Sequence, residues 1–198
     1  MGSPIIDAPI GELSFAAIDF ESAGAAPGET DLPVQVGIVR VGSLFGDEEL
    51  FSTYISCEHP VRWSASKVHG ITTAHLKDAP SMLSLWGEFR RLLSGCVVVG
   101  HNPSTEQRFL RVFPAHGFAP WLDTLALARH CMPGLPDYSL SSVCCALRLE
   151  DEVSRRVPGH TWHHALYDAV GSLEVLRAVV QGLQLQERPL STLSFAIK

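Results

Sequence analysis

The chain has 198 residues, 46% of them hydrophobic, and a formal net charge of −6. This size and composition predict a single α/β domain over residues 1–198, with a core at about 13–182 and a short C-terminal tail at 183–198. The negative charge argues against a protein that coats nucleic acid through many Lys and Arg contacts. Five cysteines without a Cys-x-x-Cys pair, no secretory signal and no apolar run of about 18 residues predict a cytoplasmic protein with free thiols and no membrane contact.

The first predicted strand, at 13–20, leads into two acids one residue apart, Asp19 and Glu21. Alternate residues of a strand share a face, so the two carboxylates lie together and Phe20 points to the other side. Like charges this close favour a neutralising cation, and oxygen ligands suit Mg²⁺ or Mn²⁺. On its own, however, an Asp-x-Glu pair is more often a polar strand end.

Two more strands are predicted at 34–41 and 49–56, and their short connections predict an antiparallel meander. The turn His69-Gly70-Ile71 follows, in which glycine permits close backbone approach and Ile71 offers an apolar platform for a base. A loop that packs Ile71 inward is the alternative. Apolar residues then recur at helical spacing over 82–93, with Ser81 as the expected N-cap.

A buried strand is predicted at 96–100 and is followed by the polar turn residue Asn102, which either orients a phosphate or caps the turn. Ser104 or Thr105 is the expected N-cap of the next helix. Glu106 therefore lies in the first helical turn beyond the carboxyl end of a strand, where α/β sheets place ligand sites. An acid at this position also complements the helix dipole, so Glu106 alone does not decide the matter.

The last elements are a short strand or turn at 122–125, which includes Asp123, and a long amphipathic helix from Ala165 onward. Asp123 either supports the site or is a structural polar group. Asp168 lies in the helix and can face the sheet. His163 precedes it by five positions, about 140° away on a regular helix, so it reaches the same site only from the preceding loop or first turn. A mobile imidazole suits a general base; a surface histidine cluster or an adventitious metal site is the alternative.

In order, these segments resemble the DEDDh branch of the DnaQ-like 3′-to-5′ exonucleases, a family with the RNase H-like fold. The resemblance spans about Leu13 to Val180 and implies a mixed five-stranded sheet, an antiparallel meander followed by parallel strands, flanked by helices. The three motifs that carry the resemblance lie at 15–24, 99–110 and 163–169. Intervening segments that also match lie at 68–72, 122–129 and 138–144.

The resemblance implies hydrolysis of single-stranded DNA or RNA from the 3′ end to 5′-nucleoside monophosphates. In this family type two divalent cations, Mg²⁺ or Mn²⁺, lie about 3.5–4 Å apart, one activating a water and one stabilising the leaving oxygen. The implied metal ligands are Asp19, Glu21, Glu106 and Asp168, with His163 as the catalytic general base. The residues implied to contact the nucleic acid are Phe20, Ser22, Ala23, His69, Gly70, Ile71 and Asn102.

The negative net charge is compatible with such a site, because bound cations neutralise the acids and only a few nucleotides are held. Basic residues near the motifs are candidates for phosphate contacts, although Arg108 is equally consistent with a solvent-facing role and the Arg155-Arg156 pair with a solvated loop. These candidates are Arg62, Lys67, Arg108, Arg155 and Arg156.

The chain departs from the family pattern at Glu106, where an aspartate is usual, and at Thr105, where phenylalanine is common. Glutamate places its carboxylate one methylene further out, whereas Mg²⁺ demands near-ideal octahedral geometry. A second hypothesis is therefore a nucleic-acid-binding module that cuts weakly or not at all. A third is a proofreading-type subunit of a polymerase assembly, with residues 181–198 as a docking segment. A homodimer is a further expectation, by analogy only.

Overall fold

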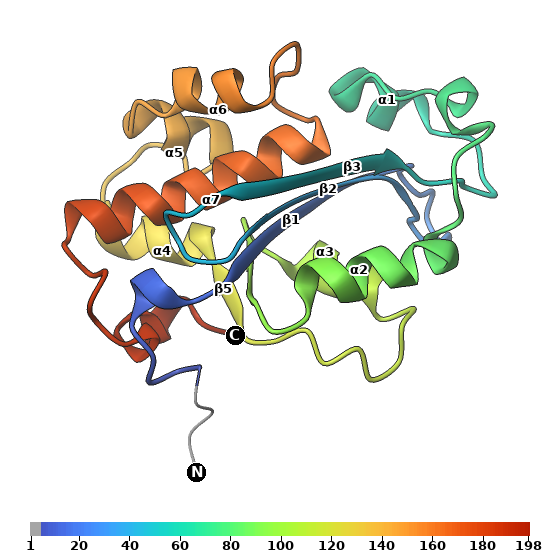
Figure 1. The fold of residues 1–198 in the computed structure, drawn as a ribbon. Helices are drawn as coiled ribbons and strands as arrows, with labels where there is room; N and C mark the ends of the chain where they lie inside the picture. Colours follow the sequence, from blue (N-terminus) through green and yellow to red (C-terminus); the bar gives the residue numbers. More distant parts are fainter. Residues whose placement is uncertain (1–4) are drawn as a thin grey trace.

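Five strands form one mixed sheet in the order β3-β2-β1-β4-β5 (Figure 1). The computed structural model describes residues 5–198. β1 pairs antiparallel with β2, and β2 with β3, whereas β4 runs parallel to both β1 and β5. This arrangement confirms the predicted meander followed by parallel strands. The strands are β1 (Phe15–Ser22), β2 (Pro33–Val41), β3 (Glu48–Tyr54), β4 (Val97–Gly100) and β5 (Trp121–Asp123).

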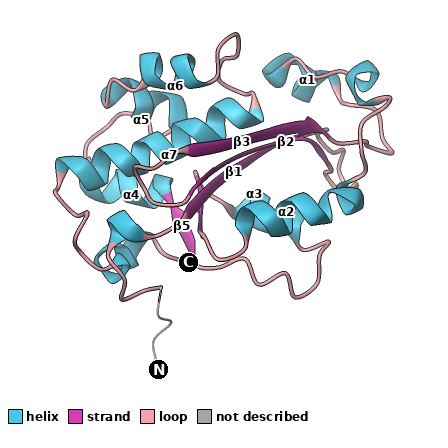
Figure 2. Cartoon of the chain, in the orientation of Figure 1, coloured by secondary structure: helices cyan, strands magenta, loops and turns pink. Residues whose placement is uncertain are grey.

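Helices cover both faces of the sheet, as Figure 2 shows. The longest helix, α7, packs against β1 and β2, and α4, α5 and α6 pack against α7. Helices α2 and α3 lie on the opposite face of the sheet. The helices are α1 (Trp63–His69), α2 (Trp86–Leu93), α3 (Ser104–Leu110), α4 (Thr124–Cys131), α5 (Leu140–Ala146), α6 (Glu150–Arg156) and α7 (Ala165–Gly182). Short 3₁₀ turns lie at η1 (Ile10–Glu12), η2 (Thr73–Leu76), η3 (Met82–Leu85) and η4 (Leu190–Ala196).

β1 supplies side chains to both layers, as the period of two requires. Phe15 and Ala17 lie in the core beneath α7, whereas Ile18 and Phe20 lie in the core beneath α2 and α3. The strand is longer than predicted, because its pairing with β2 continues to Ser22. Its two acids are therefore held within a paired strand and not in a turn after it.

Two predicted helix starts had different outcomes. Ser81 accepts a hydrogen bond from the backbone N–H of Ser84, at 3.2 Å, which confirms it as a cap. It caps the 3₁₀ turn η3, so the helix predicted over 82–93 begins as a 3₁₀ turn and becomes α-helical at Trp86. The predicted cap of α3 was wrong. The N-cap residue is Pro103, which supplies no side-chain acceptor, and Ser104 already lies within the helix.

The C-terminal tail packs against the sheet. Leu190 and Leu193 are buried in the core beneath α7, and Ile197 forms an antiparallel bridge with Leu122 of β5. The segment proposed for docking is thus part of the folded domain in the structure. Between residues 5 and 198, no helix is long and apolar enough to cross a membrane.

Gly37 of β2 lets the start of α7 approach the sheet. A Cβ at this position would lie 2.1 Å from the backbone nitrogen of Leu166, so no side chain fits without moving the helix. We expect Gly37→Ala to lower the free energy of unfolding by about 1–3 kcal/mol or more, the usual cost of overpacking, as measured by urea denaturation.

Gly42→Ala is the matched control for this substitution, because a Cβ at Gly42 would meet no atom within 4 Å. Equal effects of the two substitutions would show that close approach at Gly37 does not limit the fold.

Candidate active site

The two acids of β1 lie on the face that α7 covers. Asp19 pairs across the sheet with Gly37, where α7 comes closest, and Glu21 lies two residues further along the same face. Phe20, between them, points away and packs edge-on against Phe109, with ring centroids 5.5 Å apart. The sequence prediction that the carboxylates share a face is met by this geometry.

Asp168 enters the site from the first turn of α7. His163 lies in the loop before the helix with φ +67°, and its backbone N–H donates to Oδ2 of Asp168 at 3.2 Å. Of the two arrangements considered from the sequence, the structure therefore has the loop arrangement. Ligand atoms of Glu21, His163 and Asp168 all lie within 4.8 Å of one another.

Glu106 reaches the cluster from the first turn of α3 and is 5% exposed. Its Oε2 atom has no hydrogen-bond partner among the described residues, and neither does Oδ1 of Asp168. Burying a carboxylate oxygen without a donor is costly, so native structures seldom leave one in this state without a cause. Both atoms are free to accept an external ligand.

Burial raises the pKa of all four carboxylates, and the charges of neighbouring acids in the cluster raise it further for Asp19 and Glu21. Burial and the charges of Asp168 and Glu106 raise the pKa of Glu21 to about 8. Burial likewise raises the pKa of Glu106 to about 7 and that of Asp168 to about 7. The pKa of Asp19 is also raised well above its ordinary value, by burial and then by the charges of Asp168, Glu106 and Glu21. A cluster of partly or fully buried carboxylates that resists ionisation suits a hard divalent cation.

The predicted nucleic-acid contacts occupy different environments. The side chains of Phe20, Ala23 and Ile71 are buried, and Ile71 packs with Ala23 in a small cluster below the loop. His69 is half-buried and donates from Nε2 to the carbonyl oxygen of Ser22 at 3.0 Å. Ile71 therefore packs inward, as the alternative from the sequence had it, while His69 lies next to the end of β1.

The turn around His69 depends on the next residue. Nδ1 of His69 accepts from the backbone N–H of Ile71 at 3.0 Å, which leaves Nε2 to donate. Gly70 between them has φ +73°, in the left-handed region that glycine occupies without strain. The burial of His69, followed by the nearby charge of His163, lowers its pKa. The His69 imidazole thus lies near His163, at the edge of the acid cluster.

Asp123 holds the turn that leads to Glu106. Its Oδ1 accepts from the backbone N–H of Asn102 at 2.9 Å, and its Oδ2 forms an ion pair of 2.7 Å with Lys198. Asn102 itself has φ +60°. The sequence left Asp123 outside the catalytic set and did not single out Lys198, because nothing in the spacing shows that residues 75 positions apart meet.

Gln35 was missed by sequence reasoning. It is 3% exposed, and its Oε1 atom accepts from the backbone N–H of Ala165, the first residue of α7, at 3.1 Å. Its Nε2 atom lies 3.0 Å from Nε2 of His164. The signal available in the sequence was a polar residue inside the apolar run of β2, which indicates a buried side chain with hydrogen-bond partners. Through these contacts Gln35 fixes the helix end that carries Asp168.

The raised pKa values of the acid cluster predict how the free energy of unfolding depends on pH. Glu21 in the unfolded chain ionises near its ordinary value of 4.5, and in the folded chain near 8, so the folded state binds more protons between these values. Stability without divalent cations should therefore fall as pH rises through this window. Asp19→Asn should reduce the fall, since it removes one repelling charge, and thermal unfolding in EDTA at several pH values measures both effects.

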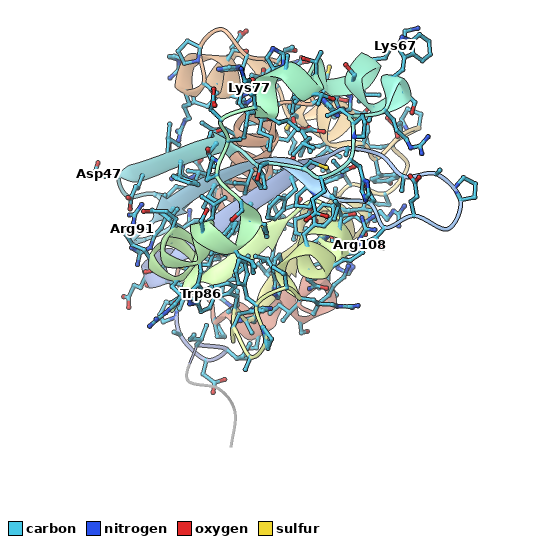
Figure 3. All side chains as sticks on the ribbon, turned by 90° about the vertical axis from the view of Figure 1, so that its right-hand side faces the viewer. Asp47, Lys67, Lys77, Trp86, Arg91 and Arg108 are labelled. Atoms are coloured by element: carbon cyan, nitrogen blue, oxygen red, sulfur yellow. The ribbon has the colours of Figure 1, made fainter. Side chains whose placement is uncertain are left out.

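Asp47→Asn is the control for that experiment, since Asp47 is exposed and follows the end of β2 opposite to the one at which Gln35 pairs with Glu21. Asp47 is labelled in Figure 3. A wild-type stability that rises between these pH values, with no difference between the two variants, would contradict the repulsion described above.

Comparison with known proteins relates this geometry to a family. A sequence profile of the exonuclease family matches residues 16–176. The chain is 27% identical to a DNA polymerase III subunit epsilon-like protein of Rhodobacter capsulatus over 92% of its length, but only 26% of the relative's. It is 32% identical to the PolC-type DNA polymerase III of Thermotoga maritima over 69% of the chain and 10% of that protein.

The chain also resembles the DNA polymerase III subunit epsilon of Rickettsia prowazekii, with 26% identity over 84% of the chain and 74% of the relative. Among solved structures it is similar to exonuclease X in complex with 5′-overhanging duplex DNA, with a TM-score of 0.71, 23% identity, and coverage of 91% of this chain and 99% of that one. The nuclease domain of 3′hExo, a DEDDh family member bound to rAMP, has a TM-score of 0.70 at 14% identity, with coverage of 92% and 98%. The profile match, together with the acids and the RNase H-like sheet that carries them, shows that this chain belongs to the DnaQ-like branch of the exonuclease family.

Proposed function

We propose that the protein is a metal-dependent 3′–5′ exonuclease that removes nucleoside 5′-monophosphates from single-stranded ends. The observation that carries the proposal is the convergence of four acids from β1, α3 and α7, two of which have a buried oxygen without a donor. A purely structural polar cluster would satisfy those oxygens. The family membership supports the reaction class, and the cluster supports the proposal that the reaction takes place at these four acids.

The donor set fits divalent cations. Asp19, Glu21, Glu106 and Asp168 offer only carboxylate oxygens, the ligand type that Mg²⁺ and Mn²⁺ prefer, and we propose that they hold two such ions. Bound cations of this kind make a water more acidic and stabilise the charge on a leaving oxygen. Glu106 is longer than the aspartate usual at this position, but it is near enough for its charge to raise the pKa of Asp19. This supports its place in the proposed ligand set.

His163 is the proposed general base. It is exposed, stands outside the helix, and is attached to the site through its backbone N–H bond to Asp168. Its side chain can therefore turn toward a water at the cluster, take the proton at a ring nitrogen, and release it to solvent. The half-buried His69 is less suited to this role, because both its ring nitrogens are already engaged by backbone groups.

The structural neighbours bind or recognise different nucleic acids, so both DNA and RNA are candidate substrates. Exonuclease X was solved with duplex DNA, and another structural neighbour is a 3′-exonuclease that recognises a histone mRNA stem-loop. The relatives named as subunit epsilon also make a polymerase assembly the second candidate function. A homodimer remains a proposal by analogy.

The first test uses 5′-labelled single-stranded DNA and RNA of the same sequence with Mg²⁺, Mn²⁺ or EDTA. We expect cation-dependent shortening from the 3′ end. Asp168→Asn should lower kcat/KM by about 100-fold or more, because it removes a cation ligand, and His163→Ala should do so by a similar factor through loss of the base. Full activity of a folded His163→Ala protein would overturn the assignment of the base.

Glu106 separates an enzyme from a binding module. If the wild-type protein cuts, Glu106→Asp should mainly change the ratio of Mg²⁺-supported to Mn²⁺-supported rates, whereas Glu106→Gln should lower both by about 100-fold. If the wild-type protein binds DNA without cutting it and Glu106→Asp creates activity, the binding-module hypothesis is correct. Melting temperatures of the variants establish that each is folded.

A further inference from the structure

Helix α1 is attached at both ends to the last residue of β1 and the residue that follows it. The backbone N–H of Arg62 donates to the carbonyl oxygen of Ala23 at 2.9 Å, and the His69 ring donates to that of Ser22 at 3.0 Å. These acceptors follow Glu21 directly. Figure 1 shows α1 beside the end of the sheet at which β1 ends. The helix is therefore held next to the acid cluster.

The first residue of this helix, Trp63, has a side chain that lies mostly in solvent. It is 73% exposed, more than any other large hydrophobic side chain between residues 5 and 198. By contrast, Trp121 is 5% exposed. Leaving an indole in water forgoes a large gain in free energy from burial, and aromatic rings exposed in this way are frequent at binding surfaces.

A cation accompanies the ring. Nζ of Lys67, one helical turn later, lies 3.9 Å from the centroid of the Trp63 ring. The stretch from residue 59 to residue 77 contains Arg62, Lys67 and Lys77 but no acid, in a chain whose net charge is −6. Figure 3 shows Lys67 projecting from the upper part of the face that also carries Arg108. Glu29 forms an ion pair with Arg62 at 2.7 Å, whereas Lys67 has no acidic partner among the described residues.

We propose that Trp63 is a base-stacking platform for a nucleotide of the single strand that runs away from the acid cluster, with Lys67 contacting an adjacent phosphate. An exposed ring beside a cation is the arrangement that binds single strands, since every base has a face to stack and every linkage carries a charge. The inference rests on the proposed exonuclease function and adds to it a residue that makes longer strands better substrates.

The proposal is tested by comparing two substrates. The p-nitrophenyl ester of thymidine 5′-monophosphate has no nucleotide outside the cluster, whereas an oligothymidylate of about 12 nucleotides reaches α1. We expect Trp63→Ala to lower the ratio of kcat/KM for the oligonucleotide to that for the ester by about tenfold, within the range of one lost base stack. Trp63→Phe, which keeps an aromatic face, should restore most of the ratio.

Phe45→Ala is the matched control, since Phe45 is 48% exposed and belongs to the connection between β2 and β3 and not to α1. It should leave the ratio as in the wild type. Binding of the fluorescein-labelled oligonucleotide to Asp19→Asn protein in EDTA, followed by anisotropy, gives a second measurement that needs no cleavage. There, adding Trp63→Ala should raise Kd by about tenfold.

The outcomes distinguish the two proposals. A wild-type protein that hydrolyses neither substrate would overturn the exonuclease function, and the anisotropy measurement would still decide whether Trp63 binds the strand. Hydrolysis of both substrates with an unchanged ratio in Trp63→Ala would overturn the stacking platform alone. An equal loss in Trp63→Ala and Phe45→Ala would also overturn it, because the effect would then not depend on α1.

Discussion

The placement of four partly or fully buried carboxylates in one cluster is the constraint that shapes this structure. Asp19, Glu21, Glu106 and Asp168 come from three separate elements, and burial raises the pKa of each. For Asp19 and Glu21, the charges of neighbouring acids in the cluster raise it further. Without an opposing force the elements would move apart. The fold supplies that force through apolar packing of α7 and α3 on opposite faces of β1.

The start of α7 shows how closely that packing is specified. Gly37 removes a side chain where the helix meets β2, and Gln35, two residues earlier on the same face, binds the N–H of Ala165. Gly37 allows α7 to approach β2, and Gln35 fixes the position of the first residue of α7. Asp168 follows three residues after this anchor, so contacts on β2 that involve no acid of the cluster bring its carboxylate close to Glu21 and His163.

Sequence patterns were sufficient for the sheet and for the acids, because both follow from local periodicity and from motif order. The face shared by Asp19 and Glu21 is a direct result of strand alternation. What could not be predicted depends on residues distant in the sequence. The contact of Asp123 with Lys198 and that of Gln35 with α7 need the tertiary fold. The inward packing of Ile71 could not be separated from an exposed platform, since an apolar residue in a turn fits both.

Two neighbouring acids show how the structure distinguishes support from chemistry. Asp123 is 4% exposed and Glu106 5%, yet their surroundings differ. Against the effect of burial, Lys198 and the backbone N–H groups of Asn102 and Leu125 hold the pKa of Asp123 below its ordinary value. Burial raises the pKa of Glu106, whose Oε2 has no donor among residues 5–198. An acid with every oxygen satisfied maintains a turn. An acid that the fold buries and leaves without a donor is available to a cation, and this difference is the reason that Glu106, and not Asp123, is proposed as a cation ligand.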